Sequence, residues 1–235
     1  MTSDQLDALV VAPHPDDAEI GCGGLLQYLG DKNIATTVIV ATSGYRSVIK
    51  KSSVISGKFY SDNLVEKIKS CDEIISSSKI KTQIRQEESL NAILSLNSKA
   101  KVEFSNFSFY ESAGYQLSQA DKIKAQSLLE PLASLGRLFV FMPNLQDKHT
   151  AHRKTTELFS QALSKLSHPE KYAGYYQTPW TGMWNIYHYN GKLGFSFSAQ
   201  VGRELLLSPG QEALDLKKLG GSLAQRYFVT RYSKI

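Results

Sequence analysis

Two short clusters of imidazole and carboxylate side chains could carry chemistry in this chain. The first contains His14, Asp16, Asp17 and Glu19 and directly follows the apolar run 8–12. An imidazole and a carboxylate three residues apart, here His14 and Asp17, can face one divalent ion, because zinc accepts nitrogen and oxygen ligands. The adjacent Asp16 could then act on a bound water as a base. The alternative is an ordinary turn in which Asp16 and Asp17 cap a helix and His14 lies on the surface.

The second cluster follows another apolar run, 139–143, and contains Asp147, His149 and His152. Histidines three residues apart share one face at the start of a helix. If 8–12 and 139–143 are neighbouring parallel strands, both clusters lie at the same edge of the sheet. One histidine of the pair could then complete a set of two histidines and one carboxylate, with a position open for water. A pair of surface histidines is the alternative, but two clusters that each follow a strand favour a metal site.

These motifs resemble those of the PIG-L/LmbE-like N-acetylglucosaminyl deacetylases. The similarity covers about residues 8–160 and centres on His14-Pro15-Asp16-Asp17-x-Glu19 and on His149-x-x-His152. That family is zinc-dependent and removes acetyl groups from N-acetylglucosamine units carried on inositol, malate, lipid or other aglycones. The resemblance therefore implies an enzyme that hydrolyses an amide.

The resemblance also implies a role for each residue of the clusters. It implies zinc ligands at His14, Asp17 and His152, a general base at Asp16, and a charged helper of the transition state at His149. Arg85, in Arg85-x-x-Glu88, is similar to the arginine that the family offers to the sugar substrate. Asp147 is expected to orient His149, because the two are close in sequence. Iron, cobalt or another divalent transition metal would also suit such a ligand set.

Three departures from the family pattern bear on the substrate more than on the reaction. Thr150-Ala151 stands between the two later histidines, where the family commonly has Pro-Asp. Tyr45 follows Thr42-Ser43-Gly44, where a glutamate is frequent. The segment 218–223 lacks the histidine that the family often carries near its C-terminal end. None of these departures removes a residue of the implied ligand set.

The order of strands and helices around these residues predicts an α/β fold. We expect a Rossmann-like, doubly wound, mainly parallel sheet that is flanked by helices. Apolar, β-rich runs predict strands over 8–13, 35–42, 101–104 and 137–142. Helices are expected near 21–31, over 82–96 and 119–135, and from the second cluster to about 166. Alternating strands and helices form parallel sheets with right-handed crossovers. The site is therefore expected at the carboxyl ends of the strands.

The segment of about 45–80 is predicted to be a basic helical insert within a single domain, 1–235. It holds much of the excess positive charge behind the formal net charge of +5. A solvated surface segment is the simplest interpretation, although a basic insert could also steer an anionic amino-sugar substrate such as a sugar phosphate. Aromatic residues are sparse in the insert, so we expect no nucleic-acid binding.

The residue pattern in the last third of the chain predicts a C-terminal β-hairpin followed by a helix. Asn190-Gly191 between two β-rich runs is a strong hairpin signal. Ser208 and Pro209 are typical of the start of a helix. Trp180 and Trp184 could stack on a sugar ring, but packing of the hairpin against the core is the simpler interpretation.

Composition limits the class of protein. A chain of 235 residues with 42% hydrophobic residues can bury one sizeable core. No apolar run approaches the ~20 residues of a membrane span, and no leader precedes the first strand, so a cytoplasmic location is expected. Two cysteines are too few for a disulfide framework. The sequence is compatible with a homo-oligomer.

The sequence thus predicts a zinc-dependent amidohydrolase acting on an N-acetylglucosamine-type sugar that is free, phosphorylated, nucleotide-linked or glycosidic. One alternative is a non-catalytic sugar- or nucleotide-binding module in which Gly21-x-Gly23-Gly24 holds phosphate. That pattern does not match a dinucleotide fingerprint, and the preceding carboxylates would repel phosphate. A nucleic-acid-binding protein that uses the basic insert is the remaining alternative.

Overall fold

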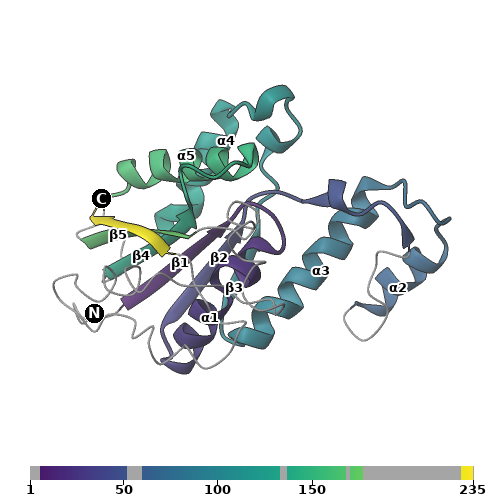
Figure 1. Ribbon diagram of the computed structural model, residues 1–235, viewed down its shortest axis with the longest axis horizontal. Helices are drawn as coiled ribbons and strands as arrows, with labels where there is room; N and C mark the ends of the chain where they lie inside the picture. The colour runs from purple at the N-terminus through teal and green to yellow at the C-terminus, as the bar shows by residue number, and fades with distance from the viewer. Residues whose placement is uncertain (1–5, 52–59, 133–136, 168–169, 177–228, 235) are drawn as a thin grey trace, which may run out of the picture.

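A computed structural model describes residues 6–51, 60–132, 137–167, 170–176 and 229–234. The hairpin and helix expected in the C-terminal third, with Trp180, Trp184 and Ser208, lie outside these residues. Figure 1 shows a central sheet with helices packed against both of its faces. The strands are β1 (Leu6–Ala12), β2 (Ala35–Val40), β3 (Lys101–Phe104), β4 (Arg137–Pro143), β5 (Glu170–Tyr176) and β6 (Val229–Lys234). The α-helices are α1 (Asp17–Asp31), α2 (Asp62–Lys69), α3 (Ser78–Leu96), α4 (Gln119–Leu129) and α5 (Thr150–Lys165).

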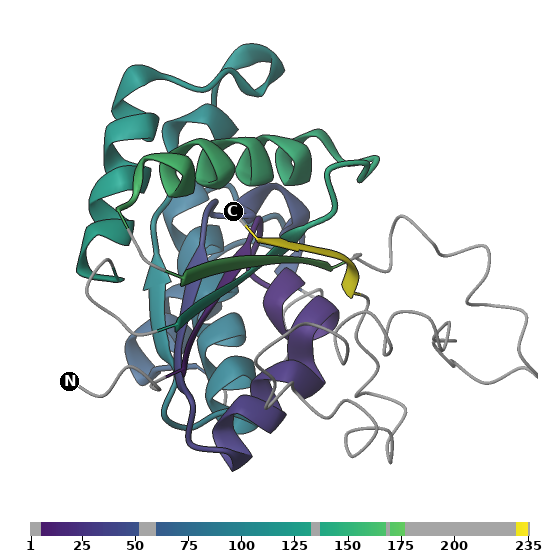
Figure 2. The same ribbon diagram turned by 90° about the vertical axis from the view of Figure 1, so that its left-hand side faces the viewer.

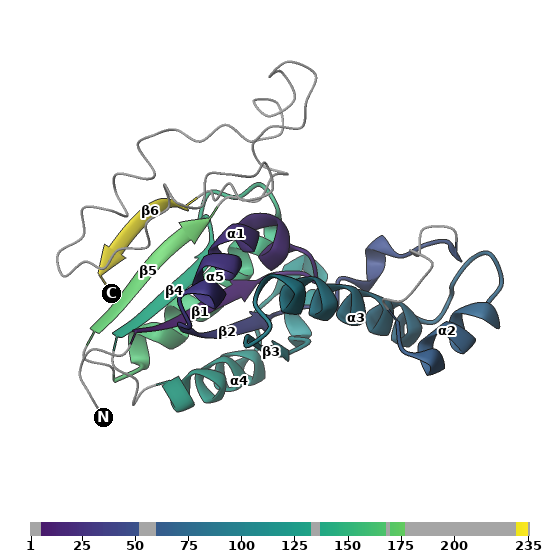
Figure 3. The same cartoon turned by 90° about the horizontal axis from the view of Figure 1, so that it is seen from below.

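The strand order in the sheet is β3-β2-β1-β4-β5-β6, which Figure 3 shows from below. The first five strands are parallel, and β6 pairs antiparallel with β5. From β1 the chain builds outward to β2 and β3 on one side, and then returns to place β4 and β5 on the other. The predicted doubly wound, mainly parallel sheet is confirmed. Such a reversal of strand order leaves a crevice at the carboxyl ends of the two central strands.

Alternate residues of β1 face two different cores. Ala8, Val10 and Ala12 pack with α1 and with Ile93 of α3, whereas Leu9 and Val11 pack with α4 and α5. Helices α1 and α3 therefore cover one face of the sheet, and α4 and α5 cover the other (Figures 1 and 2). Burial on both faces is the reason that this strand is continuously apolar from Ala8 to Ala12.

Glycine in α1 allows β5 to approach the helix. A Cβ at Gly21 would lie 2.7 Å from the ring of Tyr176, so only glycine fits at this position. The Tyr176 hydroxyl in turn donates to the carbonyl of Val11, 2.9 Å away. This contact ties β5, α1 and the end of β1 together just before the first cluster begins.

The segment 45–80 lies beside α3 rather than within the sheet. Its described residues contain a short 3-10 turn, Tyr45–Ser47, and helix α2, which lies on the far side of α3 from the sheet (Figures 1 and 3). Leu64 and Ile68 of α2 are buried in a small core of their own with Ile84 of α3. No helix in the described part of the chain has both the length and the apolar character of a membrane span.

Candidate active site

The first cluster stands on a loop that neighbouring segments hold in place. After β1, the carbonyl of Pro13 accepts hydrogen bonds from both the backbone N–H and the hydroxyl of Thr42, at 2.9 and 2.8 Å. Gly44 has φ 59° and lies against Pro15, where a Cβ would come within 2.7 Å of the proline ring. The loop after β2 therefore supports the turn that carries His14, and only glycine suits position 44.

Asp16 occupies an unusual backbone conformation at the start of α1. Its φ is 148° and its ψ is −25°, a region that costs a non-glycine residue about 1–3 kcal/mol. Asp16 stands at the N-cap position, but its side chain makes no capping hydrogen bond. The carboxylate instead pairs with the Arg85 guanidinium, with Oδ2 and Nη2 2.7 Å apart. The capping alternative is therefore wrong for Asp16, and the strained backbone directs its carboxylate toward Arg85.

The second cluster stands at the start of α5. The hydroxyl of Thr156 donates to the carbonyl of Pro143, at 2.9 Å, which fixes the helix to the end of β4. His149 is the N-cap residue, and its Nδ1 accepts the backbone N–H of Ala151 at 3.2 Å. A neutral imidazole that accepts through Nδ1 carries its proton on Nε2. His149 is therefore arranged to donate from Nε2.

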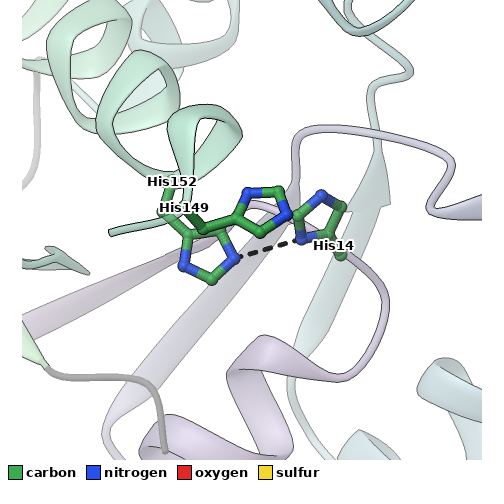
Figure 4. Close-up of side chains that lie close together, drawn as sticks. All are labelled: His14, His149 and His152. Atoms are coloured by element: carbon green, nitrogen blue, oxygen red, sulfur yellow. Dashed lines mark hydrogen bonds between the residues drawn. The ribbon is translucent and has the colours of Figure 1, made fainter. Parts of the chain in front are cut away.

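The two clusters meet across the carboxyl ends of β1 and β4. Figure 4 shows the imidazoles of His14, His149 and His152 facing one another. Asp17 Oδ2 lies 3.0 Å from His14 Nδ1 and 3.2 Å from His152 Nε2, and these two nitrogens are 3.2 Å apart. The ligand atoms of the three histidines lie within 4.8 Å of one another, so His149 is the more distant member.

The residues present fit a divalent metal. In a tetrahedral zinc site with bonds of about 2.0–2.1 Å, two ligand atoms lie about 3.3 Å apart. The triangle formed by His14, Asp17 and His152 has sides of 3.0, 3.2 and 3.2 Å. The other nitrogen of His152, Nδ1, lies 2.9 Å from Asp147 Oδ2, and a carboxylate accepts, so the proton sits on Nδ1. This leaves the lone pair of Nε2 directed at the triangle, as a metal ligand requires.

Asp147 contacts a different histidine from the one that the sequence indicated. Its Oδ2 accepts from the ring of His152, whereas its Oδ1 accepts the backbone N–H of His149, at 2.8 Å. Position 147 precedes α5, and the first turn of the helix brings residue 152, not residue 149, back over it. Asp147 is fully buried and so orients the predicted metal ligand instead of the predicted helper.

The electrostatics of the triangle favour a positive charge within it. Burial alone would raise the pKa of Asp17, but hydrogen bonds from His14 and His152 hold it well below the usual range. Burial alone would lower the pKa of His152, but hydrogen bonds to Asp147 and Asp17 raise it to about 9. Without a metal, therefore, a proton on His152 offsets part of the negative charge of Asp17 and Asp147 at pH 7.

Asp16 and His149 have pKa shifts that suit proton transfer. Burial and the neighbouring Asp17 raise the pKa of Asp16 against the opposing effect of Arg85, so Asp16 is a stronger base than an ordinary aspartate. Burial, together with His152 and His14, lowers the pKa of His149. His149 is therefore neutral near pH 7, which differs from the charged helper that the resemblance implied. A neutral imidazole can still donate a hydrogen bond from Nε2.

A cavity of about 360 Å³ lies over the triangle. Besides the two clusters, its wall includes Arg46, Tyr110 and Tyr115, which the sequence did not single out. The Arg46 guanidinium lies 4.7 Å from the centroid of the Tyr110 ring, and this ring meets the Tyr115 ring at 6.0 Å. These residues follow β2 and β3, and nothing in their spacing marks them, because only the parallel sheet brings the two loops together.

The remaining residues of the motifs lie beside the triangle and not in it. Arg85 reaches the first cluster, but its guanidinium is held by Asp16, by the carbonyl of Pro15 and by Glu88. Glu19 accepts a hydrogen bond from the hydroxyl of Ser89, at 3.3 Å, and burial raises its pKa to about 8. Arg85 lines the cavity over the triangle and can contact a substrate there, whereas Glu19 is not among the described residues of that wall.

Comparison with known families gives one match. A family model described as GlcNAc-PI de-N-acetylase (PIG-L) matches residues 9–163, which include every residue of both clusters. A search of curated protein sequences finds no match to this chain.

Solved structures with a similar fold include proteins with two different reactions. One is an N,N'-diacetylchitobiose deacetylase from Pyrococcus horikoshii, with a TM-score of 0.50, 18% identity, and coverage of 73% of this chain and 60% of that protein. Another is a 4-carboxy-2-hydroxymuconate hydratase from Pseudomonas putida, with a TM-score of 0.50, 19% identity, and coverage of 72% and 65%. This chain thus spans less than two thirds of the length of either protein. At these identities the likeness concerns the fold alone.

Proposed function

Because the chain belongs to the GlcNAc-PI de-N-acetylase (PIG-L) family, we propose that it is a metal-dependent amidohydrolase that removes the N-acetyl group from an N-acetylglucosamine-type amino sugar. The observation that carries the proposal is the triangle of His14, Asp17 and His152 atoms beneath an open cavity. Asp16 and His149 line the same cavity. Three ligands with an open position are typical of catalytic zinc sites, whereas structural sites are closed.

In this proposal the protein supplies the ligands, a base and a hydrogen-bond donor. His14, Asp17 and His152 hold the metal, and Asp147 fixes the orientation of His152. A divalent ion bound there would supply Lewis acidity, which polarises an amide carbonyl and acidifies water. Zinc is the ion we propose, although the ligand set also suits other transition metals.

The proton is carried by Asp16. Its carboxylate lies beside the triangle and takes the proton of the attacking water as the C–O bond forms. The same carboxyl group then gives the proton to the amide nitrogen as the C–N bond breaks, so that a free amine and acetate leave. Arg85 holds this carboxylate in place through the 2.7 Å ion pair, and it fixes the turn through the carbonyl of Pro15.

His149 stabilises the oxyanion that develops on the acetyl oxygen. Its Nε2 carries the proton because Nδ1 is occupied by the N–H of Ala151. A positioned donor of this kind contributes about 3 kcal/mol to the stability of a tetrahedral transition state. The low pKa keeps His149 neutral, and a neutral donor does not repel the metal.

The fold alone does not choose the reaction, because the similar structures include both a deacetylase and a hydratase. The family match over both clusters supports amide hydrolysis. A non-catalytic binding module is the weaker alternative, since a module of that kind needs no strained aspartate beside an open metal site.

The test is metal content measured together with amine release. The purified protein is reconstituted with zinc and offered N-acetylhexosamines in free, phosphorylated, nucleotide-linked and glycosidic form. We expect one ion per chain and amine release from at least one substrate. Tight zinc binding without release from any of them would contradict the proposed reaction, and a failure to bind any divalent metal would contradict the proposed centre.

Metal binding should also depend on pH in a defined way. In the metal-free protein the pKa of His152 is about 9, so one proton must leave before Nε2 can bind an ion. Zinc affinity is therefore expected to rise about tenfold for each pH unit between pH 7 and 8.5 and to level off above the pKa. Calorimetry in two buffers with different ionisation enthalpies should record about one proton released per ion. An affinity that does not change over this range would show that His152 is not a ligand.

A further inference from the structure

The residues that precede α2 are anchored to α3 close to the proposed base. The hydroxyl of Tyr60 donates to Oε1 of Glu88. Ser61 is the N-cap residue of α2, but its hydroxyl donates to Glu87 of α3, at 2.8 Å, instead of capping its own helix. The backbone N–H of Ser61 donates to the same carboxylate, at 2.7 Å. Two neighbouring residues of the segment 45–80 are therefore held by two neighbouring carboxylates of α3.

Glu88 connects Tyr60 to the ion pair of Asp16 and Arg85. The other carboxylate oxygen of Glu88, Oε2, lies 3.4 Å from Nη1 of Arg85, and Nη2 of Arg85 lies 2.7 Å from Oδ2 of Asp16. The side chains of Glu88, Arg85 and Asp16 are only 22%, 17% and 33% exposed, so solvent screens these contacts less than contacts on an open surface. A continuous path of polar contacts thus runs from Tyr60 to the carboxylate that carries the proton in the proposed reaction.

Two carboxylates share the guanidinium of Arg85. Its Nε is buried and has no hydrogen-bond partner among the residues that the structure describes, so the two terminal nitrogens make its polar contacts there. Glu88 and Asp16 are alternative acceptors for this one cation, and the distances of 3.4 and 2.7 Å favour Asp16. A guanidinium can also form two parallel hydrogen bonds with a single carboxylate, and such a bidentate pair is stronger than a single contact.

The hydrogen bond from Tyr60 acts against a bidentate pair between Glu88 and Arg85. It holds Oε1 of Glu88 toward the segment 45–80 and leaves Oε2 as the oxygen that faces Arg85. Residues three apart on a helix are neighbours, so Glu88 could turn both oxygens to Arg85 if the Tyr60 hydroxyl were absent. The guanidinium would then move toward Glu88 and away from Asp16.

We infer that Tyr60 is a positioning residue for the proposed reaction, because it holds Glu88 and thereby keeps Arg85 paired with Asp16. The inference rests on the proposed function and deepens it, since it gives the segment 45–80 a part in catalysis. Tyr60 acts through Glu88 and Arg85 rather than on the reacting atoms. Docking of this segment against α3 is then a condition for full activity.

The first experiment removes only the hydroxyl of Tyr60. Tyr60→Phe keeps the ring, which packs against the small core of Leu64, Ile68 and Ile84. The substrate is the N-acetylhexosamine that the zinc-loaded parent protein cleaves with the highest kcat/KM. We expect kcat to fall about tenfold, because a small displacement of a catalytic group is costly, while KM and zinc content stay within twofold. An unchanged kcat, or a loss confined to KM, would overturn the inference.

Ser61→Ala is the matched control. It removes a hydrogen bond between the same segment and α3, but this bond ends on Glu87 and does not belong to the path to Asp16. We expect kcat of Ser61→Ala to stay within twofold of the parent protein. Equal losses of kcat in the two variants would mean that general docking of the segment matters and that the Tyr60 hydroxyl has no particular role.

A double variant tests whether Tyr60 acts through Glu88. A neutral amide at position 88 no longer competes with Asp16 for Arg85. In a Glu88→Gln background, Tyr60→Phe should therefore change kcat by less than about twofold, because substitutions along one network are not additive. A tenfold loss that persists in this background would overturn the assigned path.

Failure of the proposed function can be told apart from failure of this inference. If the parent protein releases no amine from any N-acetylhexosamine, the proposed reaction is wrong, and the path is then tested by stability. The free energy of unfolding of the zinc-loaded protein is measured for Tyr60→Phe, Asp16→Asn and the double variant. We expect non-additive effects for this pair and additive effects for Ser61→Ala with Asp16→Asn. Additive effects for both pairs would show that Tyr60 does not position Asp16.

Discussion

The Asp16→Asn variant is expected to bind zinc as the parent protein does and to lose about a thousandfold in kcat, the loss typical when a general base is removed. Asparagine has the same shape and can still accept a hydrogen bond from Arg85, so the turn and the triangle should persist. An amide cannot take a proton from water, however, and this is the step assigned to Asp16. The measurements are zinc content per chain and steady-state amine release.

Asp31→Asn is the matched control for this variant. Asp31 is the last residue of α1, is exposed, and does not line the cavity over the triangle, so the Asp31→Asn variant should keep both zinc content and kcat within twofold of the parent protein. If Asp16→Asn kept the activity of the parent protein, Asp16 would have no part in proton transfer. If it lost zinc as well, Asp16 would be a ligand and the assigned triangle would be wrong.

The Asp17→Asn variant should lose the metal itself. Asp17 is buried and is the one carboxylate of the triangle, so its replacement removes the negative charge that offsets a divalent ion. Removing a residue that only orients a metal ligand typically lowers metal affinity by about 10–100-fold. Because Asp17 is proposed to bind the metal directly, we expect its replacement to lower zinc affinity by more, about a thousandfold or greater. Activity should fall in parallel and should recover in part at high zinc concentration. The affinity is measured by competition with a chelator, and the melting temperature of the metal-free form shows whether the variant is folded.

The zinc affinity of the Asp147→Asn variant tests whether Asp147 only orients the ligand His152, in contrast to Asp17, which is proposed to bind the metal directly. Asp147 lies 2.9 Å from the far nitrogen of His152 and does not belong to the triangle, so its amide should cost only about 10–100-fold in zinc affinity. Equal losses for Asp17→Asn and Asp147→Asn would mean that Asp17 is not a direct ligand. The Asp31→Asn variant again provides the baseline.

Most of the fold follows from local pattern. The strand predicted over 101–104 is found at those residues, and the predicted strand 137–142 extends by one residue to Pro143. The helix expected near residue 21 begins at Asp17 instead. Asp17, Ala18 and Glu19 are polar or small and look like a loop in isolation, but in the structure they form the first turn of α1 directly after the turn around Asp16. Tertiary packing thus decided where that helix begins.

The candidate site could be predicted where chemistry is concentrated in short motifs. His14, Asp16, Asp17, His149 and His152 come together as the two strand ends indicated. The partners of these residues could not be predicted. Arg85 pairs with Asp16 from 69 positions away, and the Tyr60 hydroxyl donates to Glu88 of α3. Such contacts depend on how α3 packs against α1, and the spacing of residues within a short motif does not show how two distant helices pack.

The strand reversal at β1 also governs the order in which the molecule can assemble. His14 and His152 are 138 positions apart, and they meet only after β4 has docked beside β1. A chain that has emerged only as far as β3 holds His14 and Asp17 but lacks His152, the third of the proposed ligands. An ion that binds the finished triangle and not the unfolded chain lowers the free energy of the native state by an amount that grows with the free ion concentration. If the proposed ion binds this site, a shortage of metal would lower the stability of the docked sheet and increase the fraction of unfolded chain that proteases can degrade.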